Sequence, residues 1–132
     1  MSTLTLTRGP LTLALGLGGG VVQHLRWGDQ ALLWEGGERT WDARQGRQDP
    51  ATPLACSARH SAAYPLLPYP GRLQDGALSF GGNAWSLPAH PLTAPHALHG
   101  IGWERAWAVV AEGPHTLTLA LRHEGDGHWP FA

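Results

Sequence analysis

Arg72 and His99 are the two residues whose types and positions are best suited to chemistry in this chain. Arg72 follows a Pro-Gly turn, and His99 lies in a loop closed by Gly100. Arginine keeps its charge and donates hydrogen bonds in a fixed fork, whereas histidine titrates near neutral pH. Both residues lie in turns beside a predicted β-hairpin, and loops carried by a rigid sheet commonly hold functional residues. We therefore expect Arg72 and His99 to converge on one pocket.

The predicted hairpin between these two residues consists of residues 77–80 and 83–87. Both runs have a strand-like composition, and the Gly81-Gly82 pair between them is typical of a two-residue hairpin link. We expect this β-ribbon to bring the guanidinium of Arg72 and the imidazole of His99 face to face.

Each candidate residue also has a purely structural interpretation. Arg72 could pair with Asp75 across its turn, and His99 could be a loop histidine bonded to the backbone. His96 could line the rim of the pocket. Trp103 offers either a flat face for a sugar or a large side chain for the core.

A metal site built from His90, His96 and His99 is a further alternative. Zinc generally needs three or four ligands with supporting partners around them. Pro91 and Pro95 keep this segment extended, and no cysteine joins it. We therefore expect neither a metal nor a cofactor.

A series of short motifs runs from residue 68 to residue 107. It consists of Pro68, Gly71-Arg72-Leu73, Asp75-Gly76, Leu78 to Gly81, Leu87-Pro88, Leu98-His99-Gly100, Trp103 and Trp107. In order and spacing these motifs resemble the amino-terminal signature of the aldose 1-epimerase (mutarotase) family. One departure is Gly71, which stands where the family commonly has the Asn of an Asn-Arg pair. Over the rest of the chain the resemblance is a diffuse all-β pattern.

The resemblance implies a role for each matched polar residue. His99 would contact the sugar close to the reacting centre, and Arg72 would contact sugar oxygens, with His96 and Trp103 as further substrate-binding candidates. Interconverting two anomers needs a base for the proton of the C1 hydroxyl and an acid for the ring oxygen. In the family the base is a Glu and the acid is a second His, both on later strands. Their motifs are not found in this sequence, so we expect weak or no activity from the chain alone.

The remaining segments predict strands, either because apolar residues alternate along them or, for residues 21–27 and 31–35, because glycine turns delimit them. These strands cover residues 3–7, 11–17, 21–27, 31–35, 107–111 and 116–122, and residues 112–115 join the last two. No long segment has the helical period. The prediction is an all-β, antiparallel β-sandwich, which the resemblance specifies as a mutarotase-like supersandwich and as incomplete. Residues 36–53, which include Trp41, are predicted to form a surface loop.

The carboxyl-terminal residues are unusually aromatic, with Trp129 and Phe131 close to the end. Chain termini are ordinarily polar and frayed. Either the tail folds back onto the sheet, or residues 1–132 are the amino-terminal part of a longer β-sandwich domain. The resemblance favours the second alternative.

Composition narrows the classes of partner. Hydrophobic residues make up 42% of the chain and charged residues 14%, which indicates a folded domain. The nine cationic residues are scattered among ten acidic ones, so no basic stripe is available for nucleic acid or a membrane surface. The apolar stretch 11–22 is far shorter than the roughly 20 residues that span a bilayer. Cys56 is alone and cannot form an intrachain disulfide, and we expect a cytoplasmic protein.

The sequence therefore predicts an aldose 1-epimerase-like isomerase of carbohydrate metabolism that acts on a monosaccharide, an aldohexose. A non-catalytic carbohydrate-binding module is the first alternative. The second is a structural fragment that self-associates through open sheet edges.

Overall fold

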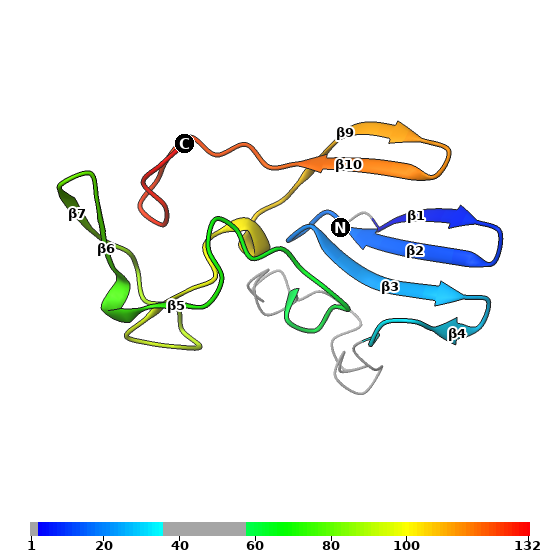
Figure 1. Cartoon of the computed structure of the whole chain (residues 1–132), viewed down its shortest axis with the longest axis horizontal. Coiled ribbons are helices and arrows are strands. Elements are labelled where there is room, and N and C mark those ends of the chain that lie inside the picture. The colour runs from blue at the N-terminus through cyan, green and yellow to red at the C-terminus, as the bar shows by residue number, and fades with distance from the viewer. Residues whose placement is uncertain (1–2, 36–57) are drawn as a thin grey trace. The chain divides into compact units, whose positions relative to one another are not determined.

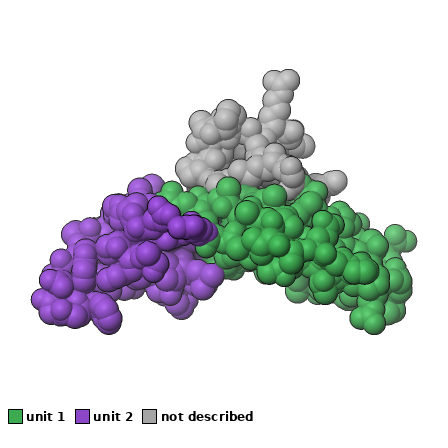
Figure 2. All heavy atoms as spheres, turned by 90° about the horizontal axis from the view of Figure 1, so that it is seen from above, with its two compact units in different colours: residues 1–65, 103–121 green, residues 66–102, 122–132 purple. Residues whose placement is uncertain are grey.

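The computed structural model describes residues 3–35 and 58–132, and the chain divides into two compact units (Figures 1 and 2). The first unit comprises residues 1–65 and 103–121, and the second comprises residues 66–102 and 122–132. The regular elements described are antiparallel β-strands and short 3-10 turns, so the all-β prediction is confirmed. Within the described ranges, no helix is long and apolar enough to cross a bilayer. The predicted loop 36–53, Trp41 and Cys56 lie outside the described residues.

A four-stranded antiparallel sheet forms much of the first unit. Its strands pair in the order of the sequence, and Leu4 lies opposite Leu15 and Leu6 opposite Leu13, as the alternation of threonine and leucine predicts. The strands are β1 (Thr3–Arg8), β2 (Leu11–Gly16), β3 (Val21–Trp27) and β4 (Gln30–Ala31). A strand over residues 31–35 was predicted, but this prediction is wrong beyond Ala31. The chain leaves the sheet after Leu32, and Glu35 is held by a side chain of β3 instead.

The first unit also contains the hairpin of β9 (Ala108–Gly113) and β10 (Thr116–Ala120). The turn is shorter than predicted, because β9 continues through Gly113 and leaves only Pro114 and His115 as the link. The Trp107 N–H donates to the Leu17 carbonyl at 2.9 Å, and His115 Nδ1 lies 2.9 Å from the Thr7 carbonyl oxygen. These bonds attach the hairpin to the first sheet at both of its ends.

Trp103 is the largest fully buried side chain among the described residues, and it lies in the core of the first unit. Its ring stacks on Tyr64 with centroids 5.7 Å apart. The other buried apolar residues of this unit are Ala14, Leu15, Val21 and Ala58.

Two short antiparallel pairs organise the second unit. β5 (Arg72–Leu73) pairs with β8 (Ala97–Leu98), and β6 (Ala77–Phe80) pairs with β7 (Asn83–Ser86). The second pair turns at Gly81-Gly82, which confirms the predicted hairpin. The 3-10 turn η2 (Gln74–Gly76) connects β5 to β6, and the 3-10 turn η3 (Gly102–Glu104) follows the segment after β8.

The tail of the chain folds back onto the β6–β7 hairpin within the second unit. The Phe131 ring meets Trp85 at a centroid distance of 4.9 Å and Phe80 at 5.8 Å. Trp129 contacts Phe131 at 5.3 Å and Tyr69 at 5.6 Å. Aromatic pairs at such distances add to the stability that burial provides. The first alternative for the aromatic tail is therefore what the structure shows, while the idea of a longer domain stays a prediction.

An ion pair joins Arg26 of β3 to Glu35, which follows the four-stranded sheet in the chain. Arg26 Nε donates to Glu35 Oε1 at 2.6 Å, and Arg26 Nη2 donates to Oε2 at 2.5 Å. This two-pronged hydrogen bond, helped by the opposite charge, holds the pKa of the Glu35 carboxyl below its ordinary value and raises the pKa of Arg26.

We expect acid to remove the contribution of this pair to stability. Because the Glu35 pKa is lowered by folding, the contribution is complete above the unfolded carboxyl's pKa of about 4.5 and disappears as pH falls through the folded value. The measurement is the urea midpoint of the chain and of Glu35→Gln between about pH 7 and pH 3. The difference between the two proteins should be small, because the pair is exposed, and should shrink on acidification. A difference that grows on acidification would contradict the argument.

Candidate functional site

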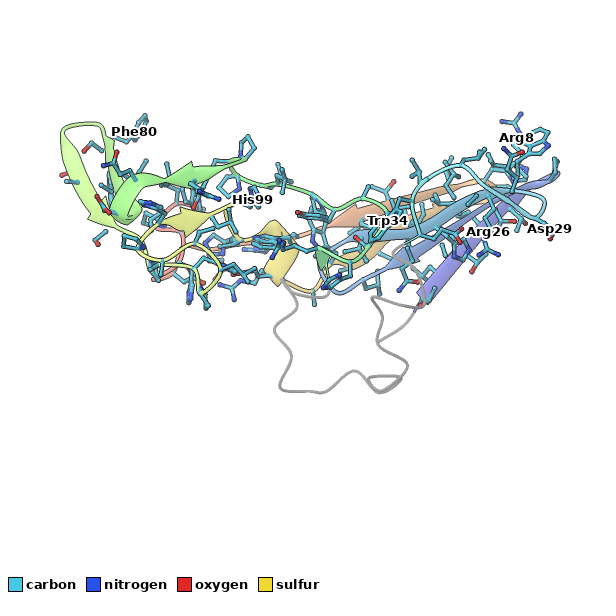
Figure 3. The ribbon with its side chains drawn as sticks, turned by 90° about the horizontal axis from the view of Figure 1, so that it is seen from below. Arg8, Arg26, Asp29, Trp34, Phe80 and His99 are labelled. Atoms are coloured by element: carbon cyan, nitrogen blue, oxygen red, sulfur yellow. The ribbon has the colours of Figure 1, made fainter. Side chains whose placement is uncertain are left out.

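The pairing of β5 with β8 brings Arg72 and His99 close together in the second unit. Arg72 lies directly opposite Leu98 in the register of the pair. The next residue along the chain is His99, which is labelled in Figure 3. The predicted reason for this proximity was wrong: the β6–β7 ribbon forms a separate two-stranded pair, and direct pairing of β5 with β8 does the positioning. This register brings the backbones of Arg72 and His99 together. That the guanidinium and the imidazole face one pocket stays a prediction.

His99 is held by two hydrogen bonds to Gly71, the residue before β5. The His99 N–H donates to the Gly71 carbonyl at 2.9 Å, and the Gly71 N–H donates to His99 Nδ1 at 2.8 Å. His99 has a φ of 57°, an uncommon left-handed conformation for a residue other than glycine. The imidazole is half-buried. The imidazole of His99 is thus held against the main chain at Gly71.

The loop after His99 is tied to Leu67. The N–H groups of Ile101 and Gly102 both donate to the Leu67 carbonyl, at 2.8 Å and 2.9 Å. Gly100 has a φ of 66°, and a Cβ placed on it would lie 2.2 Å from the same carbonyl oxygen. Only glycine fits this approach without displacing the backbone. Gly100 therefore fixes where the chain turns after His99.

Asp75 is the partner of His96 rather than of Arg72. The Asp75 N–H donates to His96 Nδ1 at 3.1 Å, and Asp75 Oδ1 lies 3.8 Å from the same nitrogen. The structural alternative in which Arg72 pairs with Asp75 is therefore wrong. The Arg72 side chain is exposed, and within residues 3–35 and 58–132 no hydrogen bond or ion pair restrains its guanidinium.

His90 and His96 shape the loop that leads into β8. The His90 N–H donates to the His96 carbonyl at 2.9 Å, and His90 Nδ1 accepts from the Leu92 N–H at 3.2 Å. In the part of the chain that the structure describes, no three histidine, cysteine or acidic side chains gather closely enough to hold a metal ion.

The burial of Trp103 bears on its two interpretations. Its side chain is 0% exposed in the core of the first unit, whereas Arg72, His96 and His99 belong to the second. Full burial leaves its indole no face for a sugar, so of the two interpretations weighed for this residue the structure favours the core.

The sequence reasoning missed the two backbone N–H groups that hold the imidazoles, those of Gly71 and Asp75. Every residue except proline carries a backbone N–H, so residue types give no signal for such a contact. The nearest hint is that glycine occupies position 71, where φ is 78°.

Two solved structures share this fold. A crystal structure of a protein from Escherichia coli K12, provisionally named an aldose 1-epimerase, aligns with a TM-score of 0.73 and 23% identity, over 94% of this chain and 37% of that one. The X-ray structure of a galactose mutarotase related enzyme from Lactobacillus acidophilus aligns with a TM-score of 0.66 and 14% identity, over 98% of this chain and 35% of that one. No protein-family model matches the sequence, and no curated protein matches it significantly.

The chain has a mutarotase-like fold. The predicted β-sandwich class is thereby confirmed, and the chain spans about a third of the length of each of the two proteins, as an incomplete sandwich would. The roles of Arg72, His96 and His99 in binding stay predictions.

We expect Gly100→Ala to destabilise the loop that carries His99. The new Cβ would meet the Leu67 carbonyl oxygen at 2.2 Å, in addition to the strain of a positive φ. Gly81→Ala is the matched control, because Gly81 also has a positive φ, of 58°, but open space around it. Urea unfolding should show a loss of about 1 kcal/mol for the control and at least about 2 kcal/mol more for Gly100→Ala. Equal losses would mean that the close approach to Leu67 is unimportant.

Proposed function

We propose that this chain is the sugar-binding part of an aldose 1-epimerase-like isomerase of carbohydrate metabolism, and that its ligand is an aldohexose. The observation that supports the proposal is the β5–β8 pairing, in which the backbone of Arg72 lies next to that of His99, on a mutarotase-like fold. The two matched proteins, one provisionally named an aldose 1-epimerase and the other named a galactose mutarotase related enzyme, support the same class of reaction.

The exposed guanidinium of Arg72 suits the binding of sugar hydroxyl groups. It stays charged at every relevant pH and presents several N–H donors in one plane. No described partner has to be displaced before it binds a ligand. In the proposed site Arg72 orients the hydroxyl groups and favours negative charge that develops on a sugar oxygen.

His99 supplies a polar group that the backbone has already oriented. The Gly71 N–H, which donates to Nδ1, orients the ring before any ligand arrives, so little conformational entropy is lost on binding. His96, also held by a backbone N–H, is proposed to contact the ligand at the edge of the same site.

Mutarotation itself consists of two proton transfers around ring opening. A base removes the proton of the C1 hydroxyl, the bond from C1 to the ring oxygen breaks, and an acid protonates that oxygen. Closure on the other face of the aldehyde gives the second anomer. By resemblance the base and the acid are a Glu and a second His whose motifs the sequence does not contain. We propose that residues 1–132 bind and orient the sugar, and that the acid and the base of the reaction are not among these residues.

A non-catalytic carbohydrate-binding module is the second candidate function. It is favoured by the same observation, because the groups that the β5–β8 pair brings together are suited to binding, and no carboxylate motif for a base accompanies them. The two candidates differ in whether turnover appears when further chain is supplied.

We expect Arg72→Ala to weaken the binding of galactose and glucose by about 10- to 100-fold, since a hydrogen bond to a charged group is worth about 1.5–3 kcal/mol. Arg122→Ala is the matched control: Arg122 lies in the same unit, is 88% exposed and pairs with Glu124. Saturation-transfer NMR on the full chain measures both variants. Equal affinity in the two variants would remove Arg72 from the site.

We also expect that the chain alone does not accelerate the exchange between the anomers of galactose and glucose above its rate in buffer. Proton transfer by a positioned acid or base accelerates a reaction about 10²- to 10⁴-fold. Residues 1–132 are not expected to supply this acid and base. Polarimetry measures the rate with and without the carboxyl-terminal portion of a mutarotase added in trans. Rapid exchange by the chain alone would contradict this division of roles, and binding without any restored exchange would favour the non-catalytic module.

A further inference from the structure

In the antiparallel pairing of β5 with β8, a bond to a side chain replaces one backbone hydrogen bond. In an antiparallel ladder, an opposed hydrogen-bonded pair exchanges two N–H···O=C bonds. Gly71 and His99 are the pair that follows Arg72 and Leu98, and the His99 N–H donates to the Gly71 carbonyl as expected. The return bond from the Gly71 N–H goes to the imidazole Nδ1 of His99, at 2.8 Å. The side chain of His99 therefore takes the position of a backbone acceptor.

This bond determines where the ring can carry its proton. A backbone N–H can only donate, so the nitrogen that receives it must present a lone pair. A neutral imidazole has one nitrogen of each kind. Since Nδ1 of His99 accepts from Gly71, the proton of the neutral ring lies on Nε2.

His96 has the same arrangement a few residues away. Its Nδ1 accepts from the Asp75 N–H at 3.1 Å, so its neutral ring also carries the proton on Nε2. Gly71 and Asp75 flank β5 and the start of η2, so one short stretch of backbone orients both imidazoles. Both donors are main-chain groups, which keep this preference whatever the side chain.

We propose that the backbone N–H of Gly71 fixes neutral His99 as a hydrogen-bond donor through Nε2, and that His99 serves its sugar by donating and not as a base. In this role the Nε2–H bond stays intact: the imidazole polarises a sugar oxygen by a hydrogen bond, and the proton leaving the C1 hydroxyl goes to another group. The tautomer of His99 does not depend on the proposed function, whereas its donation to a sugar rests on the proposed function.

The chain contains an internal control for the tautomer. His115 Nδ1 lies 2.9 Å from the carbonyl oxygen of Thr7, and a carbonyl can only accept. The neutral ring of His115 must therefore carry its proton on Nδ1, opposite to His99 and His96. His123 Nε2 lies 2.8 Å from the Trp129 carbonyl and so should match His99.

The test is a long-range proton–nitrogen NMR spectrum of the nitrogen-15-labelled full chain without sugar, at a pH above the histidine titrations. The eight histidines are assigned by single substitutions. We expect the Nε2–H pattern for His99, His96 and His123 and the Nδ1–H pattern for His115. A Nδ1–H pattern for His99, or averaging between its two tautomers, would overturn the proposal.

Two variants then separate positioning from binding. His99→Asn keeps an acceptor near the position of Nδ1 and tolerates a positive φ, whereas His99→Leu keeps neither. Exchange of the Gly71 amide should rise about tenfold in His99→Leu and little in His99→Asn. Both variants should lose affinity for galactose at least about tenfold if His99 donates to the sugar. A confirmed tautomer with unchanged affinity would overturn the proposed function while leaving the role of Gly71 intact, and unchanged Gly71 exchange in His99→Leu would overturn that role.

Discussion

The candidate site depends on one interaction, the antiparallel pairing of residues 71–73 with residues 97–99. Two strands of only two residues each form this pair, so the sheet alone gives it little stability. Neighbouring hydrogen bonds add stability to the pair. Gly71 and His99 are joined by two hydrogen bonds, one of them to the His99 side chain. The Leu67 carbonyl accepts hydrogen bonds from two N–H groups of the loop after His99. Without this pairing, Arg72 and His99 would be separated by the 26 intervening residues of the chain.

The two units are stabilised in different ways. The first has regular strands of six and seven residues and a fully buried tryptophan, so periodic sequence and a core explain it. The second has short strands and is stabilised by glycine turns, loop hydrogen bonds and the ring contacts of Phe131. The proposed ligand-binding residues all lie in this second unit, which is consistent with functional groups being carried by loops on a framework.

The arrangement of polar groups bears on how such a site would work. A mobile histidine can either accept or donate a hydrogen bond, and its side chain loses conformational entropy each time a ligand orders it. The imidazoles of His96 and His99 are oriented beforehand by backbone N–H groups, which every residue type except proline would supply at positions 71 and 75. Arg72 is different, because its side chain is exposed and could adjust to a ligand if the proposed site binds one. The site thus combines two fixed groups with one adaptable group.

The sequence by itself determined the strands of the first sheet, the Gly81-Gly82 hairpin and the all-β class, because alternation and turn glycines are local signals that survive in any context. It also led to Arg72 and His99, through the order of short motifs. Only the tertiary structure decided that β5 and β8 pair directly, that Asp75 serves His96, and that Trp103 is a core residue. These outcomes depend on contacts between residues far apart in the chain and on backbone N–H groups, neither of which residue types encode.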